Sequence, residues 1–231
     1  MNKDIILLGV MPLLIFSFVS SANGQGPNNR KILAIIASSD FRDEELLVPK
    51  GIFEKQGFEV IIASSSLKPS RGMLGAEVTP DILIREVNID EYGAVIFIGG
   101  SGASEYWNNP IAQNIAKDAL EKKKVLAAIC IAPVTLANAG VLSGKKATVW
   151  ASEANRLVKK GASYTGSAVE VDGNIITADG PASASKFAEA IIKYRHTEEF
   201  QSKLRSAARD AMDLANGWQA RPVPNFGGNH E

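Results

Sequence analysis

Residues 125–140, VLAAICIAPVTLANAG, are the stretch that most directly predicts the fold. The first five residues form a continuous aliphatic run, which is typical of a strand buried on both faces of a sheet. The following segment, 132–139, is predicted as a helix, and Gly140 suits its C-terminal cap. A buried strand that passes directly into a helix is the repeating unit of a parallel α/β sheet.

The same alternation of strand and helix continues in both directions along the chain. Further strands are predicted at 31–37, 59–63, 94–98 and 146–150, with a small one within 73–79 and a hairpin of 168–171 with 175–177 around an Asp-Gly-Asn turn. Helices are predicted at 44–56, 111–123, 153–160 and 186–194. We therefore expect a single doubly wound α/β domain over residues 31–195, with a mostly parallel, flavodoxin-like sheet covered by helices on both faces.

The two ends of the chain differ from this domain in composition. Residues 1–24 have the layout of a signal peptide, with Lys3 before an apolar run and small residues after it. We expect an exported protein, periplasmic or secreted, that keeps no stable membrane span after cleavage; an uncleaved anchor is the alternative. Residues 25–30 are a polar linker, and residues 196–231 are predicted as an added amphipathic helix and a flexible tail.

The overall composition excludes several classes of function. The formal net charge is zero and no basic stripe is present, which disfavours nucleic-acid binding. The turn after residue 98 has Glu105 where a dinucleotide-binding fingerprint needs its third glycine. No cluster of histidine, cysteine and carboxylate residues has the spacing of a metal site. We therefore expect neither a cofactor nor a metal, and a small molecule as the ligand.

Ligands of open parallel sheets bind outside the carboxyl ends of the strands. Four chemically suggestive segments follow predicted strands: acidic residues within 40–45, a glycine-rich turn at 99–102, Cys130, and the triplet 179–181. Because these strand ends lie at one edge of the sheet, we expect the segments to meet there.

Cys130 is the only cysteine of the chain, so it forms no internal disulfide. It is either a buried structural residue or a functional thiol. Ala128 and Ala132 flank it at the two positions that must be small in a nucleophile elbow. The start of the following helix would then favour the thiolate. The backbone N–H groups of Ile131 and Gly100 could stabilise an oxyanion.

Four motifs in this order resemble the ThiJ/PfpI family of the class I glutamine amidotransferase-like superfamily, which includes the parkinsonism-associated protein deglycase. They are AAICIAP at 127–133, FIGG at 97–100, DEELLVP at 43–49 and DGP at 179–181. The resemblance covers residues 31–195 and implies a homodimer. It also implies that Glu45 is protonated and donates a hydrogen bond to the Cys130 thiolate, while Asp43 and Glu44 remain solvated loop charges or helix N-terminal acids.

The resemblance and the strand-end rule together give the other candidate residues of the site. Gly99, Trp150 and Asp179 are expected around the pocket, although Trp150 could equally fill the core. Without the resemblance, Glu45 could be no more than an acid that stabilises the first turn of its helix.

The sequence departs from the family pattern in one respect. Many members have a histidine near the cysteine, but this chain has Ile131 and Trp150 there, and its histidines are His196 and His230, outside the predicted core. A peptidase that relies on a cysteine–histidine pair is therefore disfavoured. A glyoxalase-like lyase or deglycase-like hydrolase acting on small reactive carbonyls is the main expectation, and a non-enzymatic oxidative-stress sensor or chaperone that uses Cys130 oxidation is the alternative.

Overall fold

The centre of the protein is a seven-stranded sheet in the order β10-β11-β7-β6-β1-β2-β5. The structure is a computed structural model that describes residues 30–219, and the side chains of residues 30–213. The strands are β1 (Lys31–Ile35), β2 (Glu59–Ser64), β5 (Ile82–Leu83), β6 (Ala94–Phe97), β7 (Val125–Ile129), β10 (Val169–Asp172) and β11 (Ile175–Ala178). All neighbours pair in parallel except β10 with β11. The predicted doubly wound, flavodoxin-like α/β fold is confirmed.

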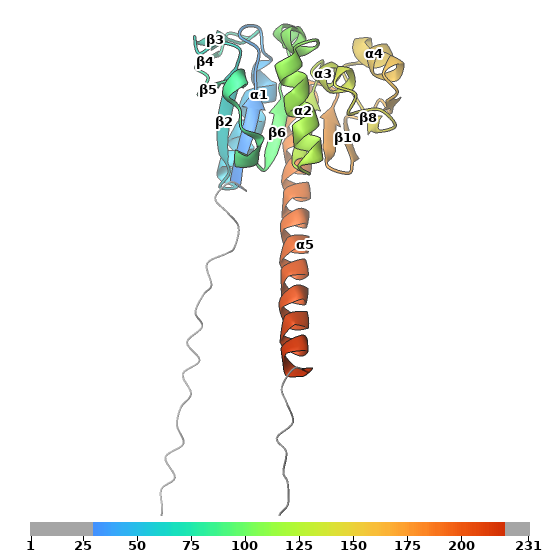
Figure 1. The fold of residues 1–231 in the computed structure, drawn as a ribbon. Coiled ribbons are helices and arrows are strands. Elements are labelled where there is room, and N and C mark those ends of the chain that lie inside the picture. The colour runs from blue at the N-terminus through green and yellow to red at the C-terminus, as the bar shows by residue number, and fades with distance from the viewer. Residues whose placement is uncertain (1–29, 220–231) are drawn as a thin grey trace, which may run out of the picture.

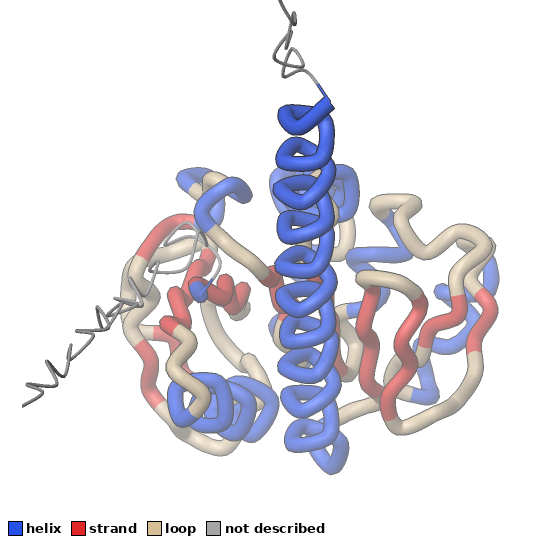
Figure 2. Tube along the Cα trace, turned by 90° about the horizontal axis from the view of Figure 1, so that it is seen from below, coloured by secondary structure: helices blue, strands red, loops and turns tan. Residues whose placement is uncertain are grey.

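Helices cover both faces of this sheet (Figures 1 and 2). The helices are α1 (Asp43–Lys55) and α5 (Ala184–Gln219) on one face, and α2 (Pro110–Glu121), α3 (Pro133–Asn138) and α4 (Ala154–Lys159) on the other side. Short 3-10 turns occupy Ile84–Glu86, Ile89–Glu91, Ser101–Tyr106, Ala151–Glu153 and Pro181–Ser183. Side chains of β1 alternate between the two faces, Leu33 toward one and Ile32 toward the other, and both are buried. This two-sided burial explains why the strands are aliphatic throughout.

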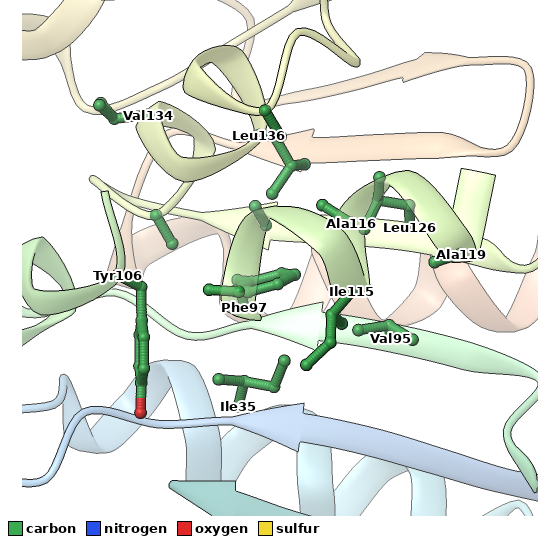
Figure 3. Close-up of a cluster of buried hydrophobic side chains, with 14 of the residues drawn as sticks. Ile35, Val95, Phe97, Tyr106, Ile115, Ala116, Ala119, Leu126, Val134 and Leu136 are labelled. Atoms are coloured by element: carbon green, nitrogen blue, oxygen red, sulfur yellow. The ribbon is translucent and has the colours of Figure 1, made fainter. Parts of the chain in front are cut away.

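One of the two cores lies under α2 and α3 (Figure 3). Phe97 of β6 lies at its centre, with Ile115 of α2 and Leu136 of α3 packed around the same space. Tyr106 is also buried here, and its hydroxyl donates a hydrogen bond to the Ile36 carbonyl oxygen at 2.9 Å and accepts one from the Ser65 N–H at 3.0 Å. These bonds join the loops after β1 and β2 at the carboxyl ends of the strands, where ligands of open parallel sheets generally bind.

The strand predicted at residues 146–150 is wrong for most of its length. Only β8 (Lys146–Ala147) is a strand, and it pairs with β9 (Ser163–Tyr164) in a separate two-stranded sheet. The Thr148 N–H then bonds to the Thr177 hydroxyl at 2.9 Å, and the Trp150 N–H bonds to the Cys130 carbonyl oxygen at 2.8 Å. Because these bonds draw the segment toward the end of β7, it cannot continue as a strand.

The small strand predicted within 73–79 is replaced by a hairpin of β3 (Ser70–Arg71) and β4 (Glu77–Val78). Of these two strands only β4 lies in the predicted range, because residues 72–76 form the turn between them. This turn packs on the first turn of α1.

The C-terminal region is one helix and not two. The sequence predicted a break between residues 194 and 199, but α5 runs without interruption from Ala184 to Gln219, so the expected boundary at 195/196 falls inside it. No glycine or proline stands between residues 194 and 199, so nothing there breaks the helix. Figure 1 shows α5 extending far beyond the sheet.

The predicted signal peptide, most of the linker and the tail beyond residue 219 lie outside the described residues. Between residues 30 and 219, no helix is both long and apolar enough to cross a bilayer.

Candidate active site

The ends of three neighbouring strands bring Cys130, Gly99 and Glu45 together. Cys130 follows β7, Gly99 follows β6, and Glu45 lies in the first turn of α1, after β1. A Cβ atom built on Gly99 would lie 2.5 Å from Cys130 Cβ and 2.5 Å from Glu45 Oε2. Such distances are below any van der Waals contact, so only glycine allows the thiol and the carboxyl to approach from its two sides.

Cys130 occupies a sharp turn between β7 and α3. Its φ of +62° lies in the left-handed region, which costs a non-glycine residue on the order of 1–3 kcal/mol. The turn is held by the Cys130 N–H, which donates to the Ala178 carbonyl oxygen at 3.0 Å, and by the bond from the Trp150 N–H to the Cys130 carbonyl oxygen. Ala128 and Ala132 are buried on either side. The geometry is that of a nucleophile elbow.

The Cys130 side chain remains accessible from a cavity. The residue is 9% exposed, and the cavity has a volume of about 370 Å³. Its lining comes from six separate segments: Arg42, Met73, Gly100, Ser101, Cys130, Ile131, Trp150, Ser152 and Pro181. A small molecule could therefore reach the sulfur, which is not sealed among aliphatic side chains.

Glu45 is fully buried beneath the cysteine. Its Oε2 accepts a hydrogen bond from the Gly99 N–H at 3.0 Å, whereas Oε1 has no partner of full hydrogen-bond geometry among the described residues. Burial raises the pKa of the Glu45 carboxyl from 4.5 to about 8, although interactions with the Cys130 thiol and the Gly99 N–H lower it. The carboxyl is therefore mostly protonated at pH 7, and Oε1 is the oxygen free to carry the proton.

The surroundings of Cys130 act on the pKa of its thiol in two opposite directions. Burial raises the pKa of the thiol to about 12, and the adjacent Glu45 adds to this rise, while N–H groups of Gly100 and Ile131 lower it. The following helix, α3, spans only six residues and begins at Pro133, so its dipole is weaker than the sequence suggested. Burial outweighs these donors, so the surroundings of Cys130 shift its equilibrium toward the thiol.

The two predicted oxyanion donors both lie at the sulfur. The backbone N–H groups of Gly100 and Ile131 interact with the Cys130 side chain from two different strand ends. Gly100 has a φ of +96°, and a Cβ there would lie 2.4 Å from both Arg42 N and Asp40 O. Glycine is therefore required at residue 100 for the turn to bring its N–H to the site.

The three residues expected around the pocket have different positions. Gly99 lies beneath the cavity and does not line it. Trp150 is 48% exposed and forms a wall between the cysteine cavity and a second cavity of about 370 Å³, so it does not fill the core. Asp179 lines only the second cavity, where its carboxylate accepts a hydrogen bond from the Ser183 hydroxyl at 2.5 Å.

Sequence reasoning missed several residues of the site. Arg42 lines the cysteine cavity and forms a two-point ion pair with Glu44, and its place beside the acidic cluster after β1 could have suggested it. Met73 gave no signal, because it comes from an irregular segment. Asp43 is a helix N-terminal acid, as expected, but the expectation of a solvated charge is wrong, since it is 5% exposed and accepts N–H bonds from the 72–76 turn.

Among the described residues, no histidine lines either the cysteine cavity or the second cavity, and His196 lies on the exposed part of α5. Nor do histidine, cysteine and acidic side chains of the described region form a group of three that could hold a metal ion. The nearest titratable partner that the structure provides for Cys130 is thus a carboxyl group, Glu45.

Residues 30–194 match the DJ-1/PfpI family, which is 165 of the 231 residues of the chain. The chain belongs to the DJ-1/PfpI family. The family region ends one residue before the predicted domain boundary at 195, and the resemblance based on four motifs is confirmed.

Individual relatives agree with this assignment. An uncharacterized protein of Methanocaldococcus jannaschii is 41% identical over 84% of this chain and 97% of its own. The deglycase PfpI of Pyrococcus furiosus is 33% identical over 65% of this chain and 90% of its own. A glutathione-independent glyoxalase of Caenorhabditis elegans is 24% identical over 71% of this chain and 88% of its own.

A solved structure agrees in fold as well. The ThiJ/PfpI domain protein of Brachyspira murdochii superposes with a TM-score of 0.72 at 32% identity, covering 73% of this chain and 98% of that protein. Deglycase and glyoxalase names among the relatives support an enzymatic role in general.

Proposed function

We propose that this protein is a cysteine-dependent enzyme that acts on small reactive carbonyl compounds, in the manner of a glyoxalase or deglycase. The observation that carries the proposal is the pairing of an accessible thiol on a strained elbow with a buried carboxyl whose pKa is about 8. A proton acceptor is most effective when its pKa lies near the working pH. Glu45 meets this condition, and it does so without a histidine.

In the first step, Cys130 adds to the carbonyl carbon. The ionised fraction of Glu45 removes the thiol proton, the sulfur–carbon bond forms, and the carbon–oxygen π bond breaks. The negative charge that develops on oxygen is stabilised by the N–H groups of Gly100 and Ile131. Glu45 then returns its proton to that oxygen, so that a neutral hemithioacetal results and Glu45 is again ionised, while Cys130 stays bound to the substrate carbon.

The cavity supports a small substrate. Its volume of about 370 Å³ lies near the lower end of the range for ligand pockets. Arg42 and Ser101 provide polar groups in the lining, while Met73, Ile131 and Trp150 provide apolar surface. A lyase would rearrange the hemithioacetal to a thioester, which water then cleaves to release the hydroxy acid and the Cys130 thiol. A hydrolase would use water to release the amine from an adduct. Both begin with the same attack by sulfur.

Methylglyoxal turnover tests the proposal. The wild-type protein is expected to convert methylglyoxal to lactate, and Cys130→Ala and Glu45→Gln are expected to lose activity. Glu44→Gln is the matched control, because Glu44 is a partly exposed neighbour that pairs with Arg42 and does not line the cavity. If wild type were no faster than Cys130→Ala on methylglyoxal and on glycated amines, the proposed function would fail.

An oxidation-based role is a second candidate, favoured by the unpartnered Oε1 of Glu45 beside an accessible sulfur. Peroxide would convert the thiol to a sulfenic acid with release of water, and a second peroxide would give a sulfinate. Protonated Glu45 could donate a hydrogen bond to a sulfinate oxygen. Intact mass after mild peroxide treatment is expected to show a two-oxygen adduct confined to Cys130; its absence would count against this candidate.

A further inference from the structure

The distal part of α5, residues 198–219, has an apolar stripe that no other part of the described chain covers. Figure 1 shows this part of the helix outside the domain. Phe200 and Leu204 are 60% and 49% exposed, and Ala207 and Ala211 are exposed as well. The spacing of these four residues is 4, 3 and 4, which is the heptad pattern of helices that pair along a seam. A solitary polar helix in water has no need of such a stripe, and helices gain most of their stability from packing an apolar face.

We propose that this stripe is a dimer interface at which the distal α5 of a second copy of this chain packs antiparallel. The register places Leu204 opposite the partner's Ala207 and Phe200 opposite the partner's Ala211. Each layer then combines one large and one small side chain, and two-fold symmetry repeats both layers. A parallel pair would instead stack Phe200 and Leu204 on their own copies at one end, and the two alanines on their own copies at the other, which gives crowded layers at one end of the stripe and loosely packed layers at the other.

Charges flanking the stripe favour the same arrangement. Lys203 and Asp210 lie on the same side of the stripe, one at each end, and both are exposed. In the antiparallel register Lys203 lies beside the partner's Asp210, and symmetry supplies the reciprocal pair. In a parallel pair Lys203 would face the partner's Ala208, so no charge pair would form. Lys203 also bonds to Glu199 within its own helix at 2.9 Å, and its three N–H donors allow both contacts.

A cavity continues the stripe at the base of the distal helix. It has a volume of about 350 Å³ and is lined by Val171, Ala190, Lys193, Tyr194 and Thr197. Ala190, Lys193 and Thr197 continue the heptad spacing backward from Phe200 into the domain. In the proposed register residues 214–219 of the partner subunit would lie over this cavity.

Association measured by sedimentation equilibrium tests the proposal. Wild type is expected to form a dimer, and Leu204→Asp should weaken it on the order of 100-fold or more, because the substitution buries a charge in two symmetric layers. Either charge reversal, Lys203→Asp or Asp210→Lys, should weaken it about tenfold through two like-charge contacts. The double reversal should restore wild-type affinity. Arg209→Asp is the matched control on the opposite face of the helix and should have no effect.

Each outcome decides for or against this interface. Restoration by the double reversal supports the antiparallel pair, and circular dichroism verifies that each variant retains its helix. A wild-type monomer would overturn the proposal, as would a dimer that is insensitive to Leu204→Asp, since association would then use another surface. Insensitivity to both single reversals would overturn the antiparallel register. Methylglyoxal turnover is measured in parallel, because its loss or retention is independent of this result.

Discussion

The first turn of α1 contains two buried acids, Asp43 and Glu45, and the hydrogen bonds available to them differ. On one side, Asp43 accepts N–H bonds from Leu74 and Ala76, each at 2.8 Å. Burial by itself raises the pKa of Asp43, but these bonds outweigh it and leave the pKa below its ordinary value of 3.8. On the other side, Glu45 has one N–H donor and a thiol beside it, and burial raises its pKa to about 8.

The comparison shows that burial alone does not determine the role of a carboxyl group. Two backbone donors fix Asp43 as an anion, which suits it to hold the turn that carries Met73 into the cavity. One donor leaves Glu45 with an oxygen that can take up and release a proton near neutral pH. The acid that holds the turn and the acid that we propose exchanges protons are thus two residues apart.

The largest expected effect is on turnover. Glu45→Gln keeps the shape of the side chain but removes proton exchange, so kcat/KM for methylglyoxal should fall by about 10²- to 10⁴-fold. Asp43→Asn should change it far less, because Asp43 does not interact with the reacting atoms. Equal losses in the two variants would remove the distinction between the two sides of α1.

A methyl group at residue 99 should push Cys130 and Glu45 apart. Gly99→Ala places its Cβ 2.5 Å from both Cys130 Cβ and Glu45 Oε2, so we expect a loss of about 2–3 kcal/mol in the free energy of unfolding, together with loss of turnover. Gly51→Ala, inside α1 with open space around it, is the control and should stabilise by about 0.5–1 kcal/mol. Urea denaturation measures both, and an unaffected Gly99→Ala would contradict the close approach.

Asp43→Asn should destabilise the protein through the 72–76 turn. An amide offers one acceptor oxygen where the carboxylate offers two, so one part-buried N–H loses its partner, at a cost of about 1 kcal/mol. Glu44→Gln is the control, because a partly exposed ion pair with Arg42 contributes at most about 1 kcal/mol. Similar urea midpoints for the two variants would show that the turn does not depend on Asp43.

The smallest effects concern the slope of stability against pH, at most about 1.4 kcal/mol per pH unit for one proton. Glu45 binds its proton more tightly in the folded state, so wild-type stability should fall as pH rises from about 4.5 to about 8. Asp43 binds its proton less tightly when folded, so its contribution should be lost as pH falls below about 4. Thermal unfolding across pH should show the first slope disappear in Glu45→Gln and the second in Asp43→Asn.

Much of the fold and the positions of the main site residues could be predicted from the sequence. Aliphatic runs bounded by turn residues located the central strands, since a strand buried on both faces tolerates few other residues. Small residues around Cys130 indicated the elbow, and the strand-end rule placed Glu45 and Gly100 near it. These features depend on backbone geometry, which leaves a local mark on the sequence.

Other features depend on tertiary contacts and left no such mark. The segment after residue 147 reads as a strand until the bond between the Trp150 N–H and the Cys130 carbonyl oxygen redirects it. The rise in the pKa of the Cys130 thiol results from burial beside Glu45, which no local pattern reports. Asp43 looks like a surface acid, and only the folded 72–76 turn gives it partners.

The central claim, that Glu45 is a proton carrier paired with Cys130, is tested most directly by titrating the Glu45 carboxyl. Carbon-13 NMR of glutamate-labelled protein, with Glu45→Gln used to assign the resonance, would follow its chemical shift against pH. A midpoint near pH 8 that changes when Cys130 is replaced by serine is the predicted result. A midpoint near 4.5, unaffected by that replacement, would contradict the account.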